Sequence, residues 1–524
     1  MPKKAENIQR ATVIVMLTLF LSRILGFIRE MIVARVYGRN YITDSFIAAF
    51  TIPDVMFYLL VGGALSSGFM PVFNSYIANE DESGAWKAAN TFITVAIIFI
   101  LVFNLFGVTF ARYLVPIVAS GLAQNKEALI LTTKLTRIMF SAVTFTVLAG
   151  LTRGVLNSYK IFTSPSLGPV LYNIGMILGA LLLGKSLGIY GISIGVIVGA
   201  IMNFAVQIPD FKRVGKRFKF ELDLHNEGYK RMLKLMGPAI IGLSISQVNL
   251  VVNQNIASVL DEGSITALRY ANRIMLLPLG IFAMGIATTI FPVLNTQVAR
   301  KEYNEFKDTL SLGLRTVMFI TIPSTIGMIV LNVPIVRLLF RTGKFTESDV
   351  KVTAFALAFY SLAVVGQSAV QIITRGFYAV QDTKTPVKIG ALTVLINIIL
   401  NLIFVRSSKL AIGGIALSYS ITSIINMLLL YKKLSEKLNG LKVSDDIKSS
   451  IKSTIASFVM GGAAFIISRV IEVKLGIDSK LVQLIDVGVS VTIAIVIYLA
   501  VAYILKMPEM DYVLGIVKKK IKRI

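Results

Sequence analysis

Long apolar segments recur along this chain and constrain its fold more than any other feature. A run of about 20 apolar residues crosses a bilayer as a helix, because a helix satisfies its own backbone hydrogen bonds in lipid. The chain is 55% hydrophobic and only 15% charged. We therefore predict an all-α polytopic membrane protein with fourteen transmembrane helices, at about residues 11–36, 43–78, 88–115, 127–157, 163–184, 188–208, 232–259, 264–296, 305–332, 349–380, 385–405, 411–431, 449–472 and 482–505.

Residue usage excludes several classes of site. The chain has no Cys and a single His, His225, which leaves no disulfide framework, thiolate nucleophile or zinc site. It also contains no Walker sequence, so we expect no ATP hydrolysis and no bound cofactor. The basic N-terminus "MPKKAENIQR" precedes an apolar run without a cleavage pattern, and we interpret it as the start of a retained first helix.

The basic residues are concentrated in the loops of one side. With a cytoplasmic N-terminus, "DFKRVGKRFKF", "YKKLSEKLNGLK" and the tail "VKKKIKRI" all lie inside, and far fewer Lys and Arg lie outside. We therefore predict that both termini are cytoplasmic. This asymmetry explains most of the net charge of +25 as topology signals beside membrane lipids, without a nucleic-acid partner. A dedicated binding patch is the alternative.

Three matches at nearly one offset indicate an internal repeat. "LTRGVLNSYKIFTSP" from Leu151 recurs as "ITRGFYAVQDTKTP" from Ile373, which aligns Arg153 with Arg375. "FMPVFNSY" recurs as "IFPVLNTQ", and "YGISIGVIVGAIMN" matches "GGIALSYSITSIIN". Six helices are an even number, so the two halves are predicted to be parallel repeats with a substrate site between them.

This repeat gives four predicted regions. They are an N-terminal lobe of six helices, a basic cytoplasmic linker, a C-terminal lobe of six helices, and two additional transmembrane helices with a basic tail, at residues 1–208, 209–234, 235–433 and 434–524.

Charged residues within the predicted spans point to a substrate site. The first span carries Arg23, Arg29 and Glu30, and a charge near a bilayer centre costs roughly 2.5–3.5 kcal/mol. Arg23 and Glu30 are two turns apart and share a face, so they could simply brace a helix contact. In the eighth span Arg269 and Arg273 share another face. Guanidinium groups converging on a cavity suit bidentate binding of phosphate, and this is the function that we favour.

Several stretches resemble one family. "LSRILGFIRE", "YITDSFIAAFTIPD", "MGPAIIGLSISQVNL", "RYANRIMLLPLG", "GKFT" and above all "GFYAVQDTKTPVKI" are similar to the MurJ-type lipid II flippases. These belong to the MOP exporter superfamily with the MATE drug exporters and the O-antigen flippases. The resemblance runs from the first helix through the twelfth, and it implies MATE-like lobes, a bacterial cytoplasmic membrane location and a monomer.

The resemblance also implies a substrate and its site. The substrate would be lipid II, the undecaprenyl-pyrophosphate-linked muropeptide, moved from the inner to the outer leaflet. Arg23, Arg29 and Arg273 match the family's cavity arginines, Asp44 matches a recurrent acidic position, and Ser22 is part of the first motif. The last two helices resemble the family's groove for the polyprenyl tail.

Other polar positions leave alternatives open. Arg153 and Arg375 are expected to snorkel or to form a gate rather than to bind substrate. Three asparagines stand where some family members place carboxylates for a cation, and they suit either Na⁺ binding or, as we favour, interhelical hydrogen bonding: Asn253, Asn397 and Asn401. Without a coupling ion, the membrane potential could drive transport.

Two other functions remain open at this point. A MOP-superfamily exporter of another substrate, either a drug or a polyprenyl-linked polysaccharide, would favour an aromatic or acidic cavity over one rich in arginine. A membrane enzyme acting on polyprenyl phosphates would need clustered carboxylates or histidines, whereas His225 lies in the linker.

Overall fold

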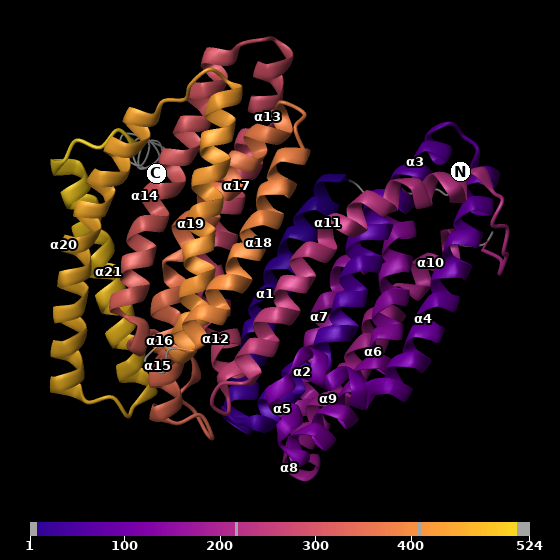
Figure 1. Cartoon of the computed structure of the whole chain (residues 1–524), viewed down its shortest axis with the longest axis horizontal. Helices are drawn as coiled ribbons and strands as arrows, with labels where there is room; N and C mark the ends of the chain where they lie inside the picture. Colours follow the sequence, from indigo (N-terminus) through magenta and orange to yellow (C-terminus); the bar gives the residue numbers. More distant parts are fainter. Residues whose placement is uncertain (1–7, 215–217, 407–409, 511–524) are drawn as a thin grey trace. The chain divides into compact units, whose positions relative to one another are not determined.

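All the secondary structure that we describe is helical. The computed structural model describes residues 8–214, 218–406 and 410–510, and these contain no β-strand. The chain forms two compact units (Figure 1). Unit 1 comprises Met1–Thr266 and Thr342–Phe345, and unit 2 comprises Ala267–Arg341 and Thr346–Ile524.

Unit 1 contains the helices up to the start of α12. Their bounds are α1 Ile8–Tyr37, α2 Tyr41–Phe57, the π-helix η1 Tyr58–Phe69, α3 Met70–Ala78, α4 Glu82–Val118, α5 Ser120–Gln124, α6 Lys126–Ser158, α7 Thr163–Leu178, the π-helix η2 Gly179–Leu183, α8 Gly184–Leu187, α9 Ile189–Ala205, α10 Ile208–Val214, α11 Glu227–Ser258 and α12 Ser264–Pro278.

Unit 2 contains most of α12 and all that follows except the four residues Thr342–Phe345. Its further elements are the π-helix η3 Leu279–Ala283, α13 Met284–Ala299, α14 Tyr303–Val330, α15 Asn332–Phe340, α16 Glu347–Ser361, α17 Ala363–Ala379, α18 Lys384–Val405, α19 Ala411–Lys437, α20 Val443–Leu475 and α21 Lys480–Ile504. The last two, α20 and α21, run side by side at the yellow end of the chain (Figure 1).

Side-chain caps explain where several helices begin. Asn40 accepts hydrogen bonds from the backbone of Ile42 and Thr43 and forms a capping box at the start of α2. Asn125 caps α6 in the same way, and Thr346 forms a capping box with Asp349 at the start of α16. Each cap satisfies backbone N–H groups that have no partner within their own helix.

Thirteen helices of the described residues are long and apolar enough to cross a membrane. They coincide with the second to fourteenth predicted spans. The first predicted span coincides with α1, which is not among the thirteen. The membrane-spanning class is thereby confirmed, whereas the count of fourteen stays a prediction.

Two of the three π-helical segments in the described residues, η1 and η3, fall at related places in the two repeats. The π-helix η1 begins at Tyr58 and η3 begins at Leu279, which are 221 residues apart, as are Pro71 and Pro292 in the sequence repeat. A π-helical turn inserts an extra residue into the α-helical ladder and is often retained at functional positions. The shared irregularity supports a common ancestry of the two halves.

Small residues allow α7 and α9 to pack closely. A Cβ atom on Gly175 would lie 2.5 Å from the Cα atom of Gly199, and one on Gly179 would lie 2.6 Å from Gly195. Membrane helices approach each other closely at such positions, because the bilayer supplies no hydrophobic drive between them. The close contact fixes α7, which in turn supports the polar residues of α1.

The position of α11 differs from the boundary expected between the lobes. The sequence repeat places this helix in the C-terminal lobe, which starts at residue 235, but in the structure α11 packs along η1 and α4 in unit 1. Tyr229 and Met232 join the apolar core of unit 1 around Trp86. The sequence repeat divides the chain before α11, whereas the packing divides it after α11, at Thr266.

Candidate functional site

A polar cluster joins α1 to α7 within unit 1. Arg29 donates from Nη2 to Oε1 of Glu30 at 2.7 Å and from Nη1 to Oδ1 of Asn173 at 3.1 Å. The side chains of Arg29 and Glu30 are only 12% and 5% exposed. Asn173 also donates to the backbone oxygen of Ser22 at 3.3 Å. This arrangement fixes the guanidinium group of Arg29 on the C-terminal half of α1.

Glu30 forms a short ion pair with its neighbour in sequence. The two-turn spacing of Arg23 and Glu30 places them on one face of the helix, and in the structure Arg29 forms a 2.7 Å ion pair with Glu30. Arg29 reaches its neighbour because its long side chain folds along the helix. Arg23 is exposed on the surface of unit 1, whereas Glu30 is buried.

Asp44 is buried and bound to the loop before α12. Its carboxylate accepts hydrogen bonds from the backbone N–H of Gly263 at 2.8 Å, the backbone N–H of Thr266 at 2.8 Å and the hydroxyl of Thr266 at 2.6 Å. Its exposure is 3%. In this structure the carboxylate of Asp44 therefore holds the loop that leads into α12.

Arg269 and Arg273 lie one turn apart on α12 and belong to unit 2, whereas α1 belongs to unit 1. Arg273 is exposed and Arg269 is half-buried. Between them, Tyr270 stacks on Phe340 of α15 with ring centroids 4.5 Å apart and planes 9° apart. The stacked ring fixes the rotation of α12 and hence the direction of both arginines.

The two repeat-related arginines have different surroundings. The guanidinium of Arg375 lies over the ring of Phe291 at 5.3 Å from its centroid, a cation–π contact. Arg153 is half-buried on α6, and its Nε atom has no hydrogen-bond partner among the described residues. The residue that corresponds to Phe291 in the first repeat is Met70. The arginine is thus present in both halves of the chain, but its aromatic partner is present only in the second half.

Two of the three asparagines lie together on one helix of unit 2. On α18, Asn401 donates to Oδ1 of Asn397 at 3.2 Å, and Asn397 donates to the hydroxyl of Thr422 on α19 at 3.3 Å. Asn253 lies on α11 in unit 1. The bond from Asn397 to Thr422 joins α18 to α19, whereas the bond from Asn401 to Asn397 lies within α18.

A second ionic cluster, in unit 2, was not anticipated. Arg337 of α15 donates to both carboxylate oxygens of Glu347 and forms a short ion pair with Glu472 of α20. Burial alone would lower the pKa of Arg337, but the two carboxylates outweigh it and raise that pKa. Arg341 binds Glu347 and Asp478. Glu347 is near both arginines in sequence, but Glu472 and Asp478 are 135 and 137 positions from theirs, so no local pattern reveals the whole cluster.

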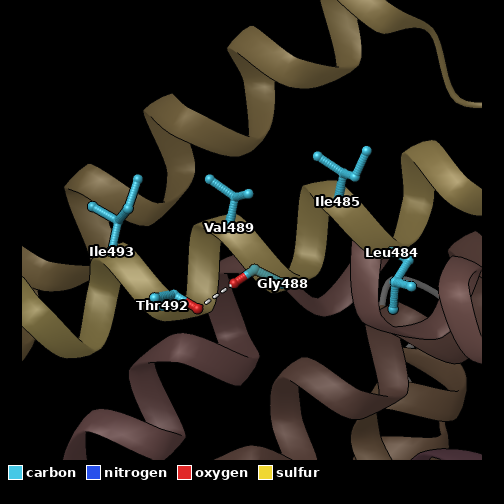
Figure 2. Close-up of a pocket in the computed structure, with 6 residues that line it drawn as sticks. All are labelled: Leu484, Ile485, Gly488, Val489, Thr492 and Ile493. Carbon is cyan, nitrogen blue, oxygen red and sulfur yellow. Dashed lines mark hydrogen bonds between the residues drawn. The ribbon is translucent and has the colours of Figure 1, made fainter.

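An apolar groove of about 370 Å³ lies on α21 (Figure 2). Its only hydrogen bond among the residues drawn joins the hydroxyl of Thr492 to the backbone oxygen of Gly488. The other lining residues are aliphatic: Leu484, Ile485, Val489 and Ile493. A groove of this kind on the additional helices suits a hydrocarbon chain.

Comparisons with known proteins agree with this geometry. A family model described as lipid II flippase MurJ matches residues 33–485. The chain belongs to the lipid II flippase MurJ family. A probable lipid II flippase MurJ of Buchnera aphidicola is 32% identical over 470 residues, covering 89% of this chain and 91% of that relative. The lipid II flippase MurJ of Burkholderia cenocepacia is 33% identical over 437 residues, covering 82% of this chain and 84% of that relative.

Solved structures place this MurJ-family chain in the expected superfamily. A structure described as lipid II flippase MurJ in the inward closed conformation has a TM-score of 0.79 at 29% identity and covers 94% of this chain and 98% of that chain. A multidrug MATE family transporter of the MOP superfamily has a TM-score of 0.67 at 14% identity, over 80% of this chain and 94% of that chain. The second likeness confirms the MATE-like fold alone.

Proposed function

We propose that this chain moves lipid II from the inner to the outer leaflet of the bacterial cytoplasmic membrane by alternating access, as the names of its relatives imply. The observation that carries the proposal is the set of arginines within membrane helices, because such charges are retained only where they face partners or a polar cavity. The family assignment favours lipid II over the exporter alternative.

The arginines fit the pyrophosphate headgroup. Arg23 and Arg273 are exposed on their respective units, and Arg29 is held in place by Glu30 and Asn173. A planar guanidinium binds a phosphate through two parallel hydrogen bonds, which an ammonium group cannot do. Arg269 and Ser22 complete the set that we assign to the headgroup, and the groove on α21 is assigned to the polyprenyl tail.

The energy source follows from the charge that moves. A pyrophosphate leaving an inside-negative cell carries negative charge outward, which the membrane potential favours by roughly 2.3 kcal/mol per charge per 100 mV. We propose that the potential drives a monomer without hydrolytic activity. Collapse of the potential with a potassium ionophore would then stop flipping, whereas removal of external Na⁺ would not. The opposite result would assign a coupling role to Asn253, Asn397 or Asn401.

Complementation tests the substrate. A bacterium depleted of its own lipid II flippase should grow when it expresses this chain, and its lipid II should become accessible at the outer surface. Growth should fail with Arg273→Ala at normal abundance in the membrane. If the wild-type chain is abundant in the membrane but neither growth nor outer-leaflet lipid II is restored, the substrate assignment is wrong.

A further inference from the structure

The buried face of α21 carries polar side chains close to its N-terminal end. Gln483, Asp486 and Ser490 follow at intervals of three and four residues, so they lie on one face of the helix. They are 4%, 4% and 0% exposed. The aliphatic residues of the groove in Figure 2 alternate with them along the same helix. One short stretch thus combines an apolar groove with a buried polar stripe.

Three oxygen atoms of this stripe make no hydrogen bond of good geometry among the residues that the structure describes: Oε1 of Gln483, Oδ1 of Asp486 and Oγ of Ser490. The hydroxyls of Ser490 and Ser468 lie within reach of the Asp486 carboxylate, so these side chains gather around it. Gln483 uses its amide N–H on the backbone oxygen of Ile477 at 2.8 Å, which leaves its carbonyl oxygen unsatisfied. A buried polar atom without a partner costs about 1–3 kcal/mol, and three together on one face require an explanation.

The neighbouring charged groups already have partners. Glu472 of α20 and Arg337 of α15 are the charged groups closest to Asp486, and they are paired with each other. Arg337 also binds Glu347, and Lys480 donates to the backbone oxygens of Arg337 and Leu338. Ser468 of α20, which is also buried, lies beside the carboxylate of Asp486.

The kind of ligand follows from the unsatisfied atoms. All three present lone pairs, and a cation can be coordinated by carboxylate, amide and hydroxyl oxygens together. The stripe has one carboxylate, so one positive charge neutralises it, whereas a divalent cation would leave excess charge in a site of low dielectric constant. We propose that Asp486, with oxygens of Gln483, Ser490 and Ser468, binds a monovalent metal cation such as Na⁺ between α20 and α21.

This site is independent of the substrate proposal and of the asparagines on α18. It lies in the two helices outside the six-helix repeats, next to the Arg337 cluster that joins α20 to α15 and α16. A bound cation would hold α21 against α20 and would thereby set the shape of the groove on the same helix. The expected effect of the ion is therefore on the stability of this helix pair.

Thermal unfolding tests the site. The purified full-length protein in choline chloride is titrated with NaCl, KCl or more choline chloride. We expect a saturable rise in Tm, on the order of 2 °C, with Na⁺ or K⁺ and none with choline. Asp486→Asn should fold but lose this rise, and Ser490→Ala should weaken the apparent affinity about tenfold. The matched control, Asp478→Asn, removes a carboxylate whose side chain is 92% exposed in the same hairpin and should keep the rise.

Hydrogen exchange locates the effect. Na⁺ should slow amide exchange in residues 480–492 of the wild type and not of Asp486→Asn. Two results would overturn the proposal. A wild type that does not respond to either cation, with Asp486→Asn at least as stable, would mean that the stripe holds a proton or water only. A response that survives Asp486→Asn and disappears in Asn397→Ala would place the cation on α18.

Discussion

Arg29 and Glu30 are neighbours in sequence, and their side chains form a 2.7 Å ion pair on α1, the helix of the first predicted span. Arg29 also donates to Asn173 on α7, so the guanidinium has donors left over for a ligand but a fixed position. The sequence left a bracing role open for Arg23 and Glu30; in the structure Arg29 makes the bracing contact, and that contact is compatible with a role in substrate binding. Substitutions that measure protein abundance and transport separately can distinguish the two roles.

Arg29→Ala should lower both folded protein and transport, because it leaves Glu30 buried without its partner at a cost of about 3–5 kcal/mol. The double variant Arg29→Ala/Glu30→Gln should recover abundance but not transport. Arg23→Ala is the matched control, since it removes an exposed arginine and should lose transport at normal abundance. Immunoblots of membrane fractions beside the complementation assay measure both quantities. Normal transport by the double variant would mean that Arg29 only braces α1.

Asp44→Asn should loosen the loop between α11 and α12. The carboxylate accepts three hydrogen bonds from this loop and α12. In the Asn variant one oxygen is replaced by an NH₂ group, which cannot accept a hydrogen bond and faces an N–H or O–H group. We expect a loss of about 1–3 kcal/mol and faster amide exchange at residues 261–266. Asp261→Asn, a change of an exposed carboxylate in the same loop, should leave the exchange unchanged. Equal exchange in the two variants would contradict the positioning role.

Arg337→Ala should release the α20 and α21 pair from α15. It leaves Glu347 and Glu472 near each other without their shared cation, which costs about 3–5 kcal/mol. Limited proteolysis between α20 and α21 should become faster, and Tm should fall. Arg469→Ala removes a 64% exposed partner of Glu472 and should change stability by less than about 1 kcal/mol. If Arg337→Ala and Arg469→Ala were equally sensitive to the protease, Arg337 would not be what holds α20 and α21 to α15.

The Asp382–Lys437 pair predicts a pH dependence at acid pH. Burial raises the pKa of Asp382, but hydrogen bonds from Lys437 and Thr385 together outweigh it and lower that pKa to about 2. Because the folded pKa lies below the unfolded value of roughly 3.9, the pair stabilises the folded state above that value. This stabilisation is lost as the pH falls through about 2. The difference in Tm between wild type and Lys437→Ala should therefore be constant above about pH 5 and vanish near pH 2; a difference that grows below pH 4 would contradict it.

Reporter fusions test the topology that the basic loops predict. Fusions at Lys216 and Lys437 should report a cytoplasmic location, and fusions at Gly263 and Lys480 an external one. The reason is the concentration of Lys and Arg in the loops that would face the cytoplasm. An internal signal at Gly263 would be incompatible with two parallel six-helix halves.

Periodicity and hydropathy predicted the helices well because they are properties of local sequence. The second predicted span, 43–78, matches Tyr41–Ala78, even though the helix passes through a π-helical segment. The repeat was equally readable, since Tyr58 and Leu279 begin π-helices at the same offset as the matched motifs.

The partners of polar residues were less predictable, because they depend on packing between distant segments. Asp44 was chosen as a substrate residue from family resemblance, but it is bonded to Gly263 and Thr266, more than two hundred positions away. Arg337 stands in an apolar run, and its partner Glu472 lies on a helix outside the repeat. No spacing rule connects such residues.

The division of the chain into units has a consequence for engineering split versions of this protein. The linker 209–234, the natural place to cut between two six-helix halves, lies wholly within unit 1. The chain instead passes between the units near Thr266, and again on either side of the four residues Thr342–Phe345. Fragments separated at the linker would each carry part of one folding unit and would have to reassemble it, whereas no single cut yields the two units as separate polypeptides.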